Sequence, residues 1–274
     1  MSYASLMLHV RPGPEGAPLL AAAVDLARRL NATLIGVGAE MFPPVVFDTG
    51  YAYVEGEIYA ALRETLERNL KTAHDAFHVA TEGLAEPALW EAGLEQPAPA
   101  VARASRAADL IIAAAATGRV DPFREAPPTD LVMTAGRPVL VLASEGEPLA
   151  GERVVVAWKD TREARRALAD ALPLLERAKE VLVLEVCESD DVEAARIRAG
   201  DVARALERHG VAARPTACAS HGDAGGEILQ QARLFGADLI VAGAYGHSRL
   251  GEWIFGGVTR ALLAQATTHL LLSH

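Results

Sequence analysis

The chain has 274 residues, of which 51% are hydrophobic and 23% are charged, and its formal net charge is −10 at pH 7. This balance is typical of a globular protein with a packed core, and no uncharged apolar stretch reaches the roughly 20 residues that a membrane-spanning helix needs. An acidic chain without a Lys/Arg cluster is poorly suited to bind nucleic acid or an anionic membrane, because both depend on neutralising phosphates. Small molecules and proteins remain as the expected partners.

The number of cysteines and the first residues of the chain indicate the cellular compartment in which the protein is expected. The chain opens with no basic segment followed by an apolar run, so no export signal is expected. The two cysteines, Cys187 and Cys218, are too few for a disulfide framework, and we expect buried, reduced and inert thiols. These features predict a cytoplasmic protein.

Two landmarks occur twice along the chain. Apolar runs at residues 6–10 and 154–158 each lead into a helical pattern, and they lie 148 residues apart. A later run, Ala-Asp-Leu-Ile followed by Ile or Val and then Ala, occurs at residues 108–113 and again at 237–242, 129 residues apart. The first copy therefore holds about 19 extra residues. We assign them to an insert near residues 41–56, which is irregular and rich in proline, glycine and aromatic residues.

The predicted domains are residues 1–145 and 151–274, joined by a short polar linker, and strands alternate with helices in each. In the second domain, strands are expected near 153–158, 181–187, 212–218, 238–243 and 268–273, and helices near 161–177, 190–209, 223–235 and 254–265. Apolar strands without polar alternation indicate a parallel sheet that is covered on both faces. The sequence thus predicts an α/β fold of two tandem, doubly wound, mostly parallel five-stranded sheets with helices on both faces. We expect the domains to pack as a pseudo-dimer, and a further homodimer stays open.

In an open α/β sheet, ligands bind beyond the carboxyl ends of the strands, where the strand order reverses. In the second domain the loops that meet there begin at Lys159 and Gly243, and the second of them leads to the start of the last helix at residues 256–259. Glycines let backbone N–H groups approach phosphate oxygens, and a helix start adds its positive dipole end. Glycine pairs before a helix are also common in tight turns, so the pattern alone allows both interpretations.

The glycines have a recognisable spacing. Gly243-x2-Gly246-x9-Gly256, followed by Gly257-Val258-Thr259, resembles the G-x2-G-x9-G-(S/T) signature of ATP-binding universal stress proteins. The segment 154–168 and the strand before the glycines resemble that family too. The resemblance covers the second domain in order and the first more weakly. It implies a Rossmann-like fold of the adenine nucleotide alpha hydrolase type. It also implies a non-catalytic role in stress response, with ATP or another adenine nucleotide bound in the C-terminal domain.

The same resemblance implies a set of nucleotide-binding residues. Gly243, Gly246, Gly256, Gly257 and Val258 would line the phosphates with Thr259 beside them, Val186 would lie near the base, and Ala157, Trp158 and Lys159 would end the first strand. Apart from the resemblance, His247 lies in the glycine loop, where it either contacts a phosphate or is simply a polar loop residue. Trp158 either stacks on a base or serves packing alone. Lys159 stands where the family has Asp, and Gly257 stands where it has Ser or Thr. Lysine can pair with phosphate but cannot coordinate Mg²⁺, so binding is expected to depend less on Mg²⁺.

The first domain lacks the glycine loop. Its fourth strand runs into residues 113–118 without a second glycine at the required spacing, and Pro122, Pro127 and Pro128 follow. We expect it to bind no nucleotide. The insert is expected to fold over this disabled site, onto the second domain or onto a neighbouring subunit, and a mobile surface loop is the alternative.

Other functions remain open. His74 and His78 lie at i and i+4 of a predicted helix, which is a possible metal pair, but the Glu of H-E-x-x-H is absent and two surface histidines are the simpler interpretation. No catalytic or metal-binding residue is assigned. A slow ATPase on the same fold and a ligand-free protein-interaction module are the alternatives to a nucleotide-binding stress protein.

Overall fold

The computed structural model describes residues 2–43, 52–116, 118–143, 148–187, 191–220, 222–246 and 257–274. The first half contains β1 (Ser5–His9), α1 (Ala17–Leu30), β2 (Thr33–Ala39), α2 (Ala52–Thr81), β3 (Ala88–Gly93), α3 (Pro97–Ala104), a 3₁₀ turn (Ser105–Ala107), β4 (Leu110–Ala114), α4 (Pro128–Thr134) and β5 (Val139–Leu142). The second half contains β6 (Arg153–Trp158), α5 (Arg162–Leu175), β7 (Glu180–Cys187), α6 (Val192–Glu207), β8 (Ala213–Ala219), α7 (Ala224–Phe235), β9 (Leu239–Gly243), α8 (Gly257–Gln265) and β10 (His269–Ser273). All nine elements expected in the second half are therefore present, close to their expected bounds.

The strands form a single sheet of ten with the order β3-β2-β1-β4-β5-β10-β9-β6-β7-β8. Every pairing is parallel except that of β5 with β10, where the two halves meet antiparallel. Each half has the same internal order, so the two predicted five-stranded sheets are present and continue into each other. The strand order reverses between β1 and β4 and again between β6 and β9, and these are the positions where an open sheet binds ligands.

Consecutive apolar residues in the strands are buried because helices cover both faces of the sheet. In β1, Leu6 and Leu8 belong to one hydrophobic cluster and Met7 belongs to the other, and all three are fully buried. The first cluster is covered by α1, α2, α5 and α6, and the second by α3, α4, α7 and α8. Each helical layer thus extends across both halves, which confirms the doubly wound architecture.

Backbone pairing and hydrogen bonds join the two halves. Leu140 and Leu271 face each other in the β5–β10 pair. Beside that pair, the backbone N–H of Ala143 donates to Nδ1 of His269 at 3.1 Å. The Tyr3 hydroxyl at the start of the chain donates to a backbone carbonyl of α5. The predicted pseudo-dimer is therefore an internal, continuous sheet, while pairing of one chain with another stays a prediction.

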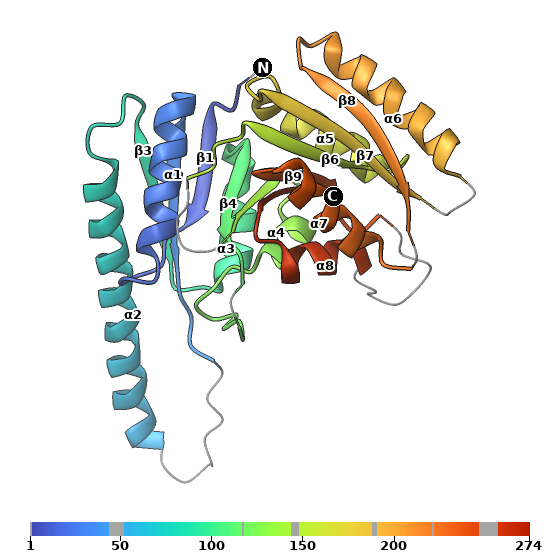
Figure 1. Cartoon of the computed structure of the whole chain (residues 1–274). Helices are drawn as coiled ribbons and strands as arrows, with labels where there is room; N and C mark the ends of the chain where they lie inside the picture. Colours follow the sequence, from blue (N-terminus) through green and yellow to red (C-terminus); the bar gives the residue numbers. More distant parts are fainter. Residues whose placement is uncertain are drawn as a thin grey trace.

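Much of the extra length of the first half is helical. Helix α2 has 30 residues and its counterpart α6 has 16. Residues 52–56 of the predicted insert form the start of α2, which projects well beyond the sheet (Figure 1). At the other end of the insert, the backbone N–H of Met41 donates to the carbonyl of Phe123 at 2.9 Å. Residues 44–51, which carry most of the expected covering role, lie outside the described residues.

Helix α2 is also the longest helix. Leu66, Ala73 and Phe77 of this helix are buried, whereas its exposed surface carries ion pairs of Arg63, Arg68 and Lys71 as well as the apolar side chains of Ile58 and Val79. No helix in the described ranges combines the length and the apolar character required to cross a bilayer.

Candidate functional site

The second-half site begins where β6 and β9 end side by side. These strands pair in parallel up to Ala157 and Ala242, so the loops that follow them leave the same edge of the sheet. The loop after β9 is bound to the first turn of α8, because the backbone N–H of Tyr245 donates to Oγ1 of the buried Thr259 at 3.3 Å. The β9 loop therefore contacts the start of α8, and the loop that carries Lys159 leaves the sheet at the same edge.

Tyr245 shows that this loop is strained. Its φ is 59°, in the left-handed region that residues with a side chain seldom adopt. Burial, with a smaller contribution from Asp130, raises the pKa of its phenol, so the ring carries no charge near neutral pH. Non-glycine residues in this conformation cluster at ligand-binding sites, where the surrounding contacts hold them.

Gly243 has a structural role that the spacing did not reveal. A Cβ at this position would lie 2.5 Å from the backbone N of Ala164 and 2.6 Å from the backbone C of Glu163, both in the first turn of α5. Its φ is not in the left-handed region. Close packing of the strand end against the helix is therefore enough to require glycine at Gly243, with or without a ligand.

Glu163 is the site residue that sequence reasoning missed. It is buried, and its Oε2 would lie 3.0 Å from a Cβ at Gly246. Burial acts to raise the pKa of this carboxyl, but hydrogen bonds from its own backbone N–H, from Arg162 and from Thr161, with the charge of Arg162, hold the pKa below its usual value. The site thus contains an ionised carboxylate at neutral pH. In the sequence Glu163 is an ordinary acid in the first turn of a helix, and nothing there signals its burial.

Lys159 is the cation of the site. Its side chain is exposed directly after β6, and within the described ranges it makes no hydrogen bond or ion pair. The next residue, Asp160, pairs instead with Arg165 on α5. Because helix α5 begins with Thr161 as its N-cap, which accepts from the N–H of Ala164, the loop that carries Lys159 is fixed at both ends.

Trp158, Ala157 and Val186 do not share one face of the sheet. Ala157 and Val186 pack toward α3, α4, α7 and α8, whereas Trp158 is buried in the opposite cluster, under α1, α5 and α6. The structure therefore supports packing as the role of Trp158, and a base that lies against Val186 is out of its reach.

The remaining predicted residues are only partly described. His247 and Gly256 lie outside the described residues. Gly257 is the exposed first residue of α8, and a Cβ there would meet nothing within 4 Å. Val258 packs partly against the core next to it.

The first half has a cavity at the carboxyl ends of β1 and β4, which correspond to β6 and β9 of the second half. This cavity has a volume of about 90 Å³ and is lined by Arg11, Arg119 and Glu125 among apolar residues. By the repeat spacing, Arg11 stands where the second half has Lys159. Arg11 is paired with Glu15 at 2.5 Å and with Glu125 at 3.4 Å. Instead of the glycine spacing, the connection from β4 to α4 here supplies Arg119 and Glu125 to the lining of the cavity.

His9 forms part of the wall of this cavity. It is buried, and its Nε2 lies 2.9 Å from the carbonyl oxygen of Ala39. Burial lowers the pKa of His9 to about 4, against the hydrogen bond to Ala39 and with help from the charge of Arg11. The imidazole is therefore neutral at physiological pH.

The two cysteines fit the expectation of inert thiols. Both are partly buried thiols, and Sγ of Cys187 donates to the carbonyl of Cys218 at 3.5 Å. Burial, with smaller effects of Glu227, raises the pKa of Cys218 to about 11, so its thiol stays protonated.

Comparison with known proteins supplies the family. Residues 151–274 match the model of the universal stress protein family. A universal stress protein from Archaeoglobus fulgidus DSM 4304 has a similar structure, with a TM-score of 0.70 and 15% identity over 98% of this chain and 95% of that one. A putative universal stress protein from Pseudomonas aeruginosa UCBPP-PA14 gives a TM-score of 0.59 and 18% identity over 99% and 93% of the two chains. No curated protein matches the sequence significantly. Residues 151–274 therefore belong to the universal stress protein family, and the residues before them repeat its fold.

Proposed function

We propose that the second half of the chain binds an adenine nucleotide such as ATP and that the protein acts in stress response as a non-catalytic, nucleotide-dependent binding protein. The observation that carries this proposal is Lys159, which has no ion-pair partner within the described ranges and follows β6 at the edge of the sheet that the β9 loop and the start of α8 also occupy. These are the groups that an open sheet uses to hold phosphates at its switch point. The family of residues 151–274 supports the same ligand.

The site has a positively charged side and a negatively charged side. Lys159 and the N-terminal end of α8 favour phosphate, while the ionised Glu163 under Gly246 disfavours it and accepts hydrogen bonds from hydroxyl groups. We infer that the phosphates lie toward Lys159 and Gly257. A lysine supplies the neutralising charge without a metal, so Mg²⁺ is expected to add little to the affinity.

Slow ATP hydrolysis is the second candidate, and Glu163 is the group that would serve it. A general base must reach the attacking water with a free oxygen. Glu163 is already engaged by Arg162, whose Nε donates to its Oε1 at 3.1 Å, and by Thr161. This engagement favours binding over rapid turnover. A ligand-free protein-interaction module is the third candidate. For all three candidate functions we propose a cytoplasmic location, which agrees with two cysteines that form no disulfide.

The test is thermal unfolding with ATP, ADP or adenosine. ATP should raise the melting temperature, because a ligand that binds only the folded state stabilises it by mass action. Lys159→Ala should weaken ATP by about 1.5–3 kcal/mol, the value of a charge-assisted hydrogen bond, and should weaken adenosine much less. Lys179→Ala is the matched control, since Lys179 pairs with Glu152 at the opposite edge of the sheet. No shift with any of the three ligands, or equal effects of the two lysine variants, would refute the proposal.

A further inference from the structure

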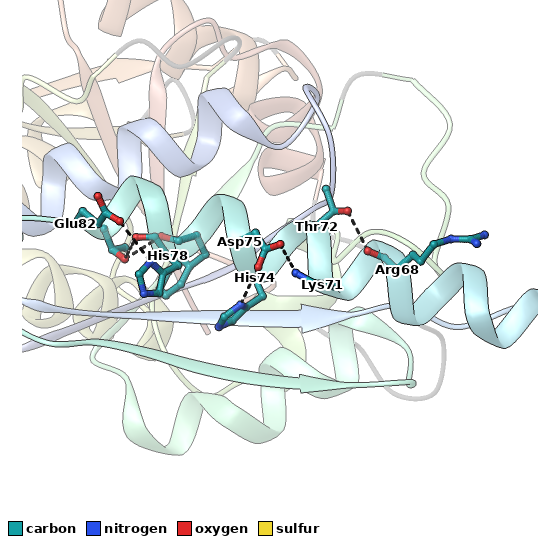
Figure 2. Close-up of polar contacts among 9 residues, drawn as sticks. Arg68, Lys71, Thr72, His74, Asp75, His78 and Glu82 are labelled. Carbon is teal, nitrogen blue, oxygen red and sulfur yellow. Dashed lines mark hydrogen bonds and ion pairs between the residues drawn. The ribbon is translucent and has the colours of Figure 1, made fainter.

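Two histidines of α2 lie side by side over the edge of the sheet. His74 and His78 are one helical turn apart, and their ring centroids are 6.2 Å apart (Figure 2). Both side chains reach solvent, with exposed fractions of 45% and 68%. The His74 ring also meets the edge of Trp90 on β3, at a centroid distance of 5.3 Å. The imidazole of His74 therefore packs against the sheet, and the imidazole of His78 lies next to it.

Each imidazole has a carboxylate at its Nδ1 atom. Nδ1 of His74 lies 3.4 Å from Oδ1 of Asp75, and Nδ1 of His78 lies 3.6 Å from Oε1 of Glu82 (Figure 2). Asp75 is itself held by Lys71 at 2.6 Å. A carboxylate at Nδ1 favours the tautomer with its proton there, which leaves the lone pair of Nε2 free for a ligand. This is the arrangement that metal-binding histidines adopt.

The spacing of the rings suits one shared ion. If both Nε2 atoms bind a tetrahedral ion at about 2.1 Å, the two ring centroids must be about 5.3 Å apart. The observed 6.2 Å exceeds this value by about 1 Å. Small side-chain rotations within one rotamer well can close such a gap.

We propose that His74 and His78 form a bidentate site for a divalent transition-metal ion that prefers imidazole, such as Zn²⁺ or Ni²⁺. Hard ions such as Mg²⁺ and Ca²⁺ need oxygen ligands, which this pair does not supply. No group of three or more His, Cys, Asp or Glu residues is arranged to hold a metal in the described ranges, so water completes the coordination. The site lies on α2, away from the nucleotide site, and does not depend on it.

Fluorescence of Trp90 can report metal binding at the His74–His78 site. Ni²⁺ quenches indole fluorescence at short range, and Trp90 already touches the His74 ring. Titration of the purified full chain with Ni²⁺ should quench part of its tryptophan emission. The midpoint should rise at least tenfold in His74→Ala and in His78→Ala, because each variant loses the chelate. Zn²⁺, which does not quench, should reverse the effect by competition. His209→Ala, an exposed histidine of the other half, should behave as the wild type.

A second pair of measurements distinguishes loss of the metal site from unfolding of the variants. Calorimetry with Zn²⁺ should give one ion per chain for the wild type and for His209→Ala, and at least tenfold weaker binding for the double variant of His74 and His78. Circular dichroism should show all variants folded, since both side chains are exposed. If the folded double variant bound Zn²⁺ as tightly as the wild type, or if its Ni²⁺ quenching midpoint were unchanged, the site would not exist.

Discussion

Replacing Gly243 by alanine separates a packing glycine from a ligand-binding one. The added methyl carbon would lie 2.5 Å from the backbone N of Ala164, well inside contact distance, and the neighbouring atoms belong to the backbone of α5. A flexible side chain could move aside, but this helix turn is fixed by its Thr161 cap. Overpacking typically costs 1–3 kcal/mol, and we expect about 3 kcal/mol here because backbone must shift.

The matched variant is Gly257→Ala. A Cβ at Gly257 meets nothing within 4 Å, so this variant should retain its stability or gain up to about 1 kcal/mol from the better helix propensity of alanine. Urea and thermal unfolding without ligand measure both effects. For a chain of this size, about 3 kcal/mol corresponds to a decrease of roughly 6–12 °C in melting temperature. A Gly243→Ala protein with wild-type stability would show that the strand end and α5 are not packed as described.

Three further changes test other parts of the structure. The pKa of His9 is lowered from 6.5 to about 4 in the folded state, so the unfolded chain binds the proton more readily between these pH values. The contribution of neutral His9 to the free energy of unfolding is therefore complete above pH 6.5, and about 3 kcal/mol of it is lost as the pH falls to 4. Urea unfolding across this range should show that loss in the wild type and not in His9→Gln. Tyr3→Phe should lower the free energy of unfolding by about 1 kcal/mol, since the hydroxyl links the two halves, and an unchanged value would mean that this contact adds nothing. Glu163→Gln should tighten ATP binding relative to adenosine in calorimetry by removing a negative charge, whereas weaker ATP binding would show that the carboxylate holds the ligand.

The strands and helices of the second half could be predicted from local pattern. Strands β6, β7, β9 and β10 are apolar runs that are largely buried, as in residues 153–158, whereas the terminal strand β8 is half-buried or exposed. The repeat then fixed the order of elements in both halves. These features depend on short stretches of sequence, so they can be read without knowing the tertiary structure.

What could not be predicted depends on contacts between distant segments. The burial of Glu163 follows from the approach of Gly246 to the start of α5. The side of the sheet that Trp158 faces follows from strand register. The start of α2 looked irregular because proline and glycine precede and interrupt it, yet Gly56 lies inside the helix. The first-half cavity is formed by the ends of β1 and β4 together with the connection from β4 to α4, so it depends on contacts that the local sequence does not show.

Calorimetric titration of the full chain with ATP tests the central claim most directly, because it counts sites as well as measuring affinity. Arg11→Ala is the control, since Arg11 occupies in the first half the position that Lys159 occupies in the second. Our account predicts one ATP per chain, much weaker binding in Lys159→Ala and unchanged binding in Arg11→Ala. Two ATP molecules per chain, no binding at all, or a loss of binding in Arg11→Ala instead of Lys159→Ala would contradict it.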